Sequence, residues 1–248
     1  MLNYYVNTIQ GKDGDHLGDH VDKLFRLGQK MELPDGRIFR YCSAGESLIA
    51  STLQQSPVVH ADYLDEASST HAIDTNNFTL STTTQAEAAN AFQDGYLTYE
   101  NADQLGGAAF IDRHGIIASG SPGTANGIIR AGVRWPVAVA TAKKINQLKN
   151  TWAGIEQCDS PETSTLAGVV NFAIVSGDWG WCQTMGVCSC LVEGTVIAGQ
   201  EVRAGETTDG SVTAMNYDEA GVADYGPIGR VVEVAASTEF GLIYLTVE

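Results

Sequence analysis

The stretch Asp178–Val202, DWGWCQTMGVCSCLVEGTVIAGQEV, decides between a metal or redox site and the wall of a β-barrel. Its first thirteen residues hold two tryptophans and three of the chain's five cysteines. Alternate residues of a strand share a face, so Trp179 lies beside Trp181, and Cys188 lies beside Cys190. Aromatic residues at this spacing favour packing over stacking on a ligand. The stretch therefore predicts a strand.

The cysteines of this stretch do not have the spacing of a metal site. A structural zinc site uses two close ligand pairs such as C-x2-C, or one pair with histidines. Cys182, Cys188 and Cys190 instead follow a C-x5-C-x-C pattern, and no histidine follows His114. Buried free cysteine behaves as a small hydrophobic residue. We therefore expect these three cysteines in the core, with no bound metal.

The composition favours strands and turns over helices. The chain has 248 residues, of which 44% are hydrophobic, 18% are charged and 27 are glycine. After Thr165, short apolar runs alternate with turn residues, as in a small barrel or sandwich. In the last run, Leu242 and Tyr244 alternate with Ile243 and Leu245, which gives one apolar and one mixed face. The predicted fold class is mainly β, with short-stranded β-barrel or sandwich modules and at most one or two short helices.

Three local patterns predict particular elements. The PDG at residues 34–36 predicts a hairpin turn between two strands. The alanine-rich run Thr84–Phe92, with Thr84 as a cap and Gly95 as a terminator, predicts a helix. The run VATAKKINQLKN at residues 139–150 fits a helix, with Ala142, Ile145 and Leu148 at a spacing of three. The part KINQL also fits a strand, in which Ile145 and Gln147 alternate with Asn146 and Leu148.

We divide the sequence into an N-terminal arm (1–28), a β-rich N-terminal domain (29–160) and a C-terminal β-barrel or sandwich (161–248). The arm begins with an apolar patch that contains Tyr4 and Tyr5, followed by a stretch rich in glycine and aspartate. Such a segment cannot build a core alone. It either covers a neighbouring copy or adds an edge strand to its own domain.

The charge and the apolar runs exclude some classes of partner. The net charge is −16, so an anionic surface repels nucleic acid and anionic lipid. The longest apolar run, Leu166–Val175, is too short for a membrane span, and the N-terminus lacks the pattern of a signal peptide. The odd number of cysteines argues for reduced thiols. We therefore expect a protein made in a cytoplasm, with neither nucleic acid nor membrane as a partner.

The remaining motifs do not form an active site. In GDHLGDH (14–20), His16 and His20 are four residues apart beside aspartates, which suggests a metal site, but the composition favours a solvated loop. SGSPGTANG (119–127) lacks the lysine of a phosphate-binding loop, and no G-x-S-x-G nucleophile elbow occurs. We therefore expect no catalytic, cofactor-binding or metal-binding residues, no cofactor, and no enzymatic activity.

Four segments of the chain resemble a known family. In order they are GRIFRYCSAGESLIASTLQQSPV (36–58), AANAFQDGYLTYENAD (88–103), VRWPVAVATAKKINQLKNTWAGI (133–155), and GWCQTMGVCSCLVEGTVIAGQEV (180–202) with IGRVVEVAASTEFGLIYLTVE (228–248). Their order is similar to a family of tailed-bacteriophage virion proteins commonly encoded near the major capsid protein. The resemblance implies that KINQLKN is a strand. GDHLGDH and the cysteine-rich composition of the strand in the fourth segment depart from the family's pattern.

The resemblance implies a capsid decoration, or cement, protein on the outer surface of the virion. Its partners would be the major capsid protein and further copies of itself, and many weak contacts would act together through avidity. The alternative is a head fibre or tail-associated module that recognises host-surface glycan. Trp135 or Trp152, each beside a turn residue, would then be an exposed stacking platform, although burial in the core is the commoner role of tryptophan.

Overall fold

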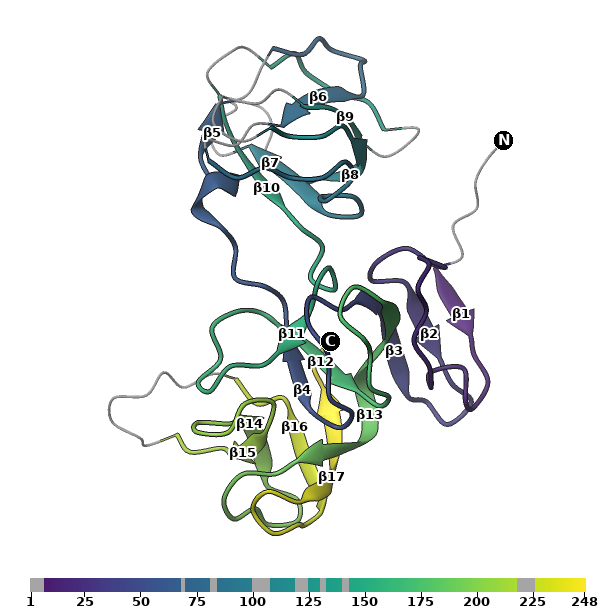
Figure 1. The fold of residues 1–248 in the computed structure, drawn as a ribbon, viewed down its shortest axis with the longest axis vertical. Coiled ribbons are helices and arrows are strands. Elements are labelled where there is room, and N and C mark those ends of the chain that lie inside the picture. The colour runs from purple at the N-terminus through teal and green to yellow at the C-terminus, as the bar shows by residue number, and fades with distance from the viewer. Residues whose placement is uncertain are drawn as a thin grey trace. The chain divides into compact units, whose positions relative to one another are not determined.

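The computed structural model describes residues 7–67, 70–80, 84–99, 108–118, 125–129, 133–139, 143–217 and 226–248. These residues form strands and turns in two compact units (Figure 1). Unit 1 comprises Met1–Val58 and Thr151–Glu248, and unit 2 is the inserted segment Val59–Asn150. The predicted mainly β fold class is confirmed. No helix among the described residues is long and apolar enough to cross a membrane.

The central strand of unit 1 is β13 (Trp179–Leu191), which contains the cysteine-rich stretch. Its first half pairs with β3 (Ile38–Ser43) and β12 (Leu166–Val170), and its second half pairs with β17 (Phe240–Thr246). Residues 180–184 are all buried, because hydrophobic clusters cover both faces of the strand there. From residue 185 onward, buried and more exposed residues alternate, so only one face of this half lies against a core.

The sheet of unit 1 runs in the order β1-β2-β3-β13-β17-β16-β14-β15, with β12, β4 and β11 branching from β13 (Figure 1). Its remaining strands are β1 (Thr8–Gln10), β2 (Lys30–Glu32), β4 (Leu53–Gln55), β11 (Glu156–Gln157), β14 (Glu201–Ala204), β15 (Val212–Ala214) and β16 (Gly229–Glu233).

This sheet curls into a half-barrel around a hydrophobic cluster. The backbone of Gly210, just before β15, connects that end of the sheet to the branch that contains β4 and β11. Its N–H donates to the carbonyl of Cys158 at 2.8 Å, and its carbonyl accepts from the N–H of Leu53 at 2.7 Å. The predicted C-terminal barrel therefore also uses β4 and β11, which precede residue 161.

The described part of the predicted N-terminal arm belongs to unit 1. β1 pairs in parallel with β2, and Gly11 packs so closely that a Cβ there would lie 2.7 Å from the sulfur of Met31. Leu27 is buried in the same unit. This pairing corresponds to the alternative of an edge strand in the same chain. Tyr4 and Tyr5 lie outside the described residues.

Unit 2 contains a six-stranded sheet in the order β5-β10-β7-β8-β9-β6. The strands are β5 (Glu66–Ala67), β6 (Asn77–Leu80), β7 (Tyr96–Tyr99), β8 (Ala108–His114), β9 (Ala125–Ile129) and β10 (Lys144–Leu148), and a short 3-10 helix, η1, spans Ala61–Tyr63. The sequence KINQL is thus a strand, as the family resemblance implied. An aromatic cluster that includes Tyr63, Phe92 and Trp135 forms the core.

The helix predicted at Thr84–Phe92 is wrong. Residues 89–94 form consecutive turns, and Glu87 makes an isolated β-bridge with Ile117. Asn90 and Asp94 have positive φ angles of 66° and 65°, which a right-handed helix cannot contain. The N–H of Phe92 donates instead to a ring nitrogen of His114 at 2.9 Å. These contacts override the helix propensity of the alanines.

The predicted boundaries at residues 28 and 160 do not coincide with this division into units. β2, β3 and β4 join the same sheet as β12 and β13, so residues 29–58 belong with the C-terminal part of the chain. Such pairing between distant segments leaves no local sign in sequence composition.

Candidate functional site

The five cysteines, Cys42, Cys158, Cys182, Cys188 and Cys190, are all free and buried. Cys188 and Cys190 face the half-barrel core, and Cys182 packs with Cys42 in a second cluster. Burial raises the pKa of Cys42 and of Cys158 to about 12, so both thiols stay protonated. The predicted core position of the cysteine-rich stretch is confirmed. No group of three or more potential metal ligands occurs within the described ranges.

The two tryptophans of β13 both pack on Tyr41, in agreement with the predicted packing role. Trp181 is buried, with its ring 5.1 Å from that of Tyr41 and 5.4 Å from that of Phe25. Trp179 stacks on Tyr41 at 6.0 Å, and the ammonium of Lys23 lies 5.4 Å from its ring. These rings form part of a hydrophobic cluster rather than a ligand platform.

The expectation of a solvated loop at GDHLGDH is wrong for its histidines. His16 is only 5% exposed and packs on Phe39, with their ring centres 4.8 Å apart. Burial and the nearby charge of Arg37 lower the pKa of His16, so the imidazole is neutral at pH 7. The backbone of His20 exchanges two hydrogen bonds of 2.8 Å with Trp179. The two histidines thus contact β3 and β13, whereas Gly14, Asp15 and Leu17 are exposed.

Neither tryptophan proposed as a glycan platform is exposed for stacking. Trp135 is 4% exposed, and its indole N–H donates to the carbonyl of Asn77 at 2.8 Å. Trp152 is half-buried, donates to the carbonyl of Ala167 at 3.0 Å, and has the guanidinium of Arg40 at 5.2 Å from its ring. Both side chains serve packing.

A pocket of about 550 Å³ in unit 2 contains the buried His114. It is lined by Asn77, Asn90, Arg113, His114, Gly115, Gly127 and Ile128. One ring nitrogen of His114 accepts the N–H of Phe92, and the other donates to the carbonyl of Gly115 at 2.7 Å. Burial lowers the pKa of this histidine. Since both nitrogens are engaged, His114 has a structural role and does not act as a general base.

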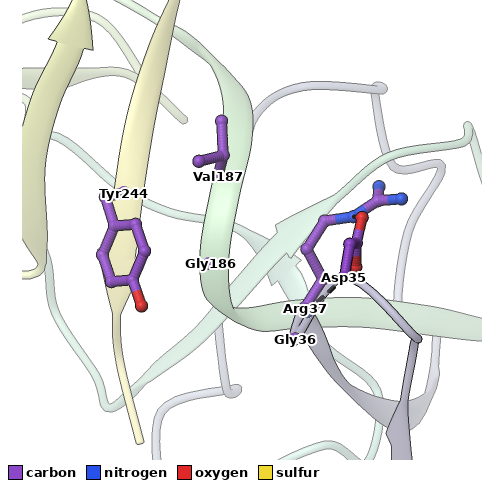
Figure 2. Close-up of a pocket in the computed structure, with 6 residues that line it drawn as sticks. All are labelled: Asp35, Gly36, Arg37, Gly186, Val187 and Tyr244. Atoms are coloured by element: carbon purple, nitrogen blue, oxygen red, sulfur yellow. Dashed lines mark hydrogen bonds and ion pairs between the residues drawn. The ribbon is translucent and has the colours of Figure 1, made fainter.

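A second pocket, of about 460 Å³, lies in unit 1 (Figure 2). One wall is the turn between β2 and β3, where Gly36 has a φ of 85°, which confirms the hairpin predicted at PDG. Arg37 is fixed there by ion pairs of 2.6 Å to Asp35 and 2.9 Å to Asp13. In Figure 2 this wall faces Gly186 and Val187 on β13, with Tyr244 beyond them on β17.

Gly186 shapes the floor of this pocket. Its φ is 93°, and a Cβ at this position would lie 3.0 Å from Cγ and 3.2 Å from Cα of Arg37. Only glycine combines this backbone conformation with so close an approach. The register of β13 against β3 also shifts just before it, between Gln183 and Met185. Here β13 leaves β3 and begins to pair with β17.

The pocket opens beside an exposed side of the sheet, which we call the outer face. It is the solvent side of β13, β17 and β16, and its apolar members are Val187, Leu191, Val232, Phe240, Leu242 and Tyr244. Val187, Tyr244 and Phe240 are 41%, 46% and 56% exposed. An exposed apolar patch with aromatic residues and a polar rim is typical of a protein-binding surface.

The outer face is close to electrically neutral. Arg230 on β16 forms an ion pair of 2.8 Å with Glu201 on the neighbouring β14, and Glu233 near the other end of β16 adds one negative charge. The chain as a whole carries −16. Neither the outer face nor the pocket beside it contains a nucleophile with a neighbouring base. The arrangement therefore suits binding rather than catalysis.

Comparison with protein-family models, with curated proteins and with solved structures gave no match.

The outer face was not predicted from the sequence, although the sequence of β17 contains part of its pattern. The alternation of Leu242 and Tyr244 with Ile243 and Leu245 predicted one mixed face, and this face is the exposed one. The alternation could not predict which strand lies next to β17. Val187 and Tyr244 are 57 residues apart, and only their pairing creates a continuous patch.

Proposed function

We propose that this chain is a structural protein of a tailed-bacteriophage virion, a capsid decoration protein that binds the assembled shell from outside and stabilises it. In this proposal it is made in the host cytoplasm, and its partners are the major capsid protein and copies of itself. The resemblance of the four sequence segments supports the proposal. Two of these segments contribute β3 and β13, which pair directly in the central sheet.

The observation that carries the proposal is the outer face, an exposed apolar surface on a firmly paired sheet. A decoration protein works only through contacts with other proteins, and it needs a folded surface ready to make them. The anionic charge discourages non-specific association of free copies before the shell is present.

The glycan-binding alternative has no comparable support. It required an exposed aromatic platform at Trp135 or Trp152, and both side chains pack inward.

The test uses shells purified from a phage that lacks this chain. Purified protein is added, and the mixture is sedimented and then heated. We expect saturable co-sedimentation at many copies per shell and a higher disruption temperature of the shell. Failure to co-sediment with shells at any ratio would overturn the proposal.

A further inference from the structure

We infer that the pocket of unit 2 binds an acidic sugar, a ligand that carries a carboxylate beside several hydroxyl groups. The side chains that carry the inference are Asn77, Asn90, Arg113 and Ile128, which line this pocket of about 550 Å³. A volume of this size is typical of sites for small molecules. The inference adds a ligand site that uses no tryptophan platform, and it does not rest on the decoration role proposed above.

A β-bulge in β8 turns Arg113 toward this pocket. Ile111 and Arg113 pair with consecutive residues of β9, so Asp112 is an extra residue in β8. Because strand side chains alternate, Arg113 would otherwise lie on the buried side with Ile111. The bulge places His114 on the buried side instead and leaves Arg113 exposed. Bulges are common next to functional sites, where they redirect a side chain.

The bulge also aligns Arg113 with two residues of neighbouring strands. β8, β9 and β6 lie side by side in unit 2 (Figure 1). Ile128 of β9 pairs with Arg113 on one side and with Asn77 of β6 on the other. Residues paired in this way share a face of the sheet, with successive Cβ atoms about 5 Å apart. The Cβ atoms of Arg113 and Asn77 are therefore about 10 Å apart, which leaves space for one sugar ring over Ile128.

Asn90 supplies a further polar group at the end of β8. Asn90 Oδ1 accepts the N–H of His114 at 3.0 Å, and the carbonyl of His114 accepts the N–H of Asn90 at 3.2 Å. These bonds fix Asn90, while its amide nitrogen makes no hydrogen bond within the described ranges. The side chain of Asn77 makes none there either. Sugar hydroxyl groups donate and accept hydrogen bonds, so both amides can bind them.

Arg113 provides the positive charge for a carboxylate. In unit 1, each of Arg37, Arg40, Arg203 and Arg230 forms an ion pair with an acidic side chain. Among the described residues Arg113 has no such partner, and none of those that line the pocket is acidic. The planar guanidinium can therefore donate two parallel hydrogen bonds to a carboxylate of the ligand.

A carboxylate fits this pocket better than a phosphate group. Phosphate carries up to about two negative charges, and its sites use the backbone N–H groups of a helix N-terminus or several cationic side chains. Arg113 is the only lysine or arginine in the described lining, whose residues come from strands and turns. One guanidinium balances the single charge of a carboxylate. The apolar side chain of Ile128 then contacts the C–H groups of the sugar ring.

The charge of unit 2 opposes an anionic ligand much less than the charge of unit 1. Unit 2 contains six basic and nine acidic residues, which give a net charge of −3. Unit 1 contains eight basic and 21 acidic residues, which give −13. The long-range repulsion of an anion is therefore weaker around unit 2.

The first test is an NMR titration of the isotope-labelled full chain with sodium glucuronate. We expect saturable shifts of the amide signals of Gly115 and Gly127, which line the pocket, and none at Gly186 in the pocket of unit 1. The dissociation constant should be about 1–10 mM, as is usual for a ligand of this size. Signals that do not move up to about 50 mM glucuronate, or that move only at Gly186, would overturn the inference.

Three related compounds test the class of ligand. Glucose lacks the carboxylate, acetate lacks the hydroxyl groups, and inorganic phosphate replaces the carboxylate. Each should bind at least about tenfold more weakly than glucuronate, because each loses one set of contacts. Glucose of equal affinity would exclude the role of Arg113, and acetate or phosphate of equal affinity would exclude an acidic sugar.

Two matched arginine variants locate the carboxylate. Arg113→Gln removes the proposed partner, and Arg134→Gln is the control. Arg134 is also an exposed arginine of unit 2 without an ion pair in the described part of the chain, and it is not among the described lining residues. We expect glucuronate binding about tenfold weaker for Arg113→Gln and unchanged for Arg134→Gln. Equal affinities of the two variants would contradict the proposed site.

A third variant tests the pocket itself. A Cβ at Gly115 would meet no atom within 4 Å beyond its chain neighbours, so Gly115→Leu fills the pocket without displacing the surrounding residues. This variant should keep the melting temperature of the natural chain and lose glucuronate binding. Full binding by a stable Gly115→Leu chain would overturn the site. These measurements use no phage shells, so their outcome is independent of the shell-binding test.

Discussion

Val187 and Tyr244 lie opposite each other on the exposed side of β13 and β17, and their neighbours Cys188 and Ile243 pair on the buried side. A single step along either strand thus separates the proposed interface from the core. Because strand side chains alternate, a slip of one residue would place Tyr244 in the half-barrel and Ile243 in water. Substitutions on the two faces should therefore have different effects, and these effects can be measured separately.

Substitution to alanine at these adjacent positions should lower stability by very different amounts. Ile243→Ala empties a fully buried site and should lower the free energy of unfolding by about 2–5 kcal/mol. Tyr244→Ala removes only a cross-strand contact on the exposed face and should cost less than about 1 kcal/mol. Urea unfolding followed by tryptophan fluorescence measures both. Equal losses would show that Tyr244 is part of the core.

Gly186→Ala should destabilise unit 1 more than Gly177→Ala. Both glycines have positive φ angles, 93° and 88°, so each substitution carries the backbone cost of about 1–2 kcal/mol. Only at Gly186 does the new Cβ also press on Arg37, whereas the space around Gly177 is open. Comparing the two free energies of unfolding isolates the contact with Arg37. Indistinguishable values would mean that the turn at Arg37 moves aside without cost.

The cysteines should be inert and free of metal in the folded protein. Burial keeps the thiols of Cys42 and Cys158 protonated well beyond pH 8, and a thiol must ionise and be accessible to react. We expect a chromogenic disulfide reagent at pH 8 to modify the cysteines only as denaturant unfolds the chain. Elemental analysis should find no stoichiometric zinc or iron. Rapid modification in the native state, or unfolding on addition of a chelator, would contradict this prediction.

Glu162 should make unit 1 less stable as the pH rises. Burial raises the pKa of this half-buried carboxyl from 4.5 to about 7, against the opposing charge of Arg203. Between these pH values the folded chain holds a proton that the unfolded chain has released, so unfolding becomes easier as the pH increases. Glu162→Gln keeps the neutral form at every pH. The melting temperature of this variant should fall less than that of the natural chain between pH 5 and pH 8. The same change of melting temperature with pH in both proteins would contradict the raised pKa of Glu162.

Much of the local structure could be predicted from the sequence. Strand alternation placed Cys188 and Cys190 on the core side, and PDG placed the turn between β2 and β3. Both patterns depend only on neighbouring residues, so the sequence carries them directly. The helix at Thr84–Phe92 failed for the converse reason. Its alanines favour a helix, but contacts with the distant His114 and Ile117 fix a chain of turns instead.

The arrangement of the chain and the candidate site could not be predicted in this way. The N-terminal strands join a sheet whose other members lie beyond residue 150, with a second unit inserted between them. The outer face needs β13 beside β17, and the pocket also needs the turn at Arg37. Three segments that are far apart in sequence come together there, so no short sequence motif could predict the pocket.

The most direct test of the central claim is an image of the virion. Cryo-electron microscopy of particles with and without this chain should show added density on the outside of the shell, repeated over its capsomers. The half-barrel of unit 1 should fit that density. Density confined to a single vertex or to the tail, or identical maps of the two particles, would contradict the account.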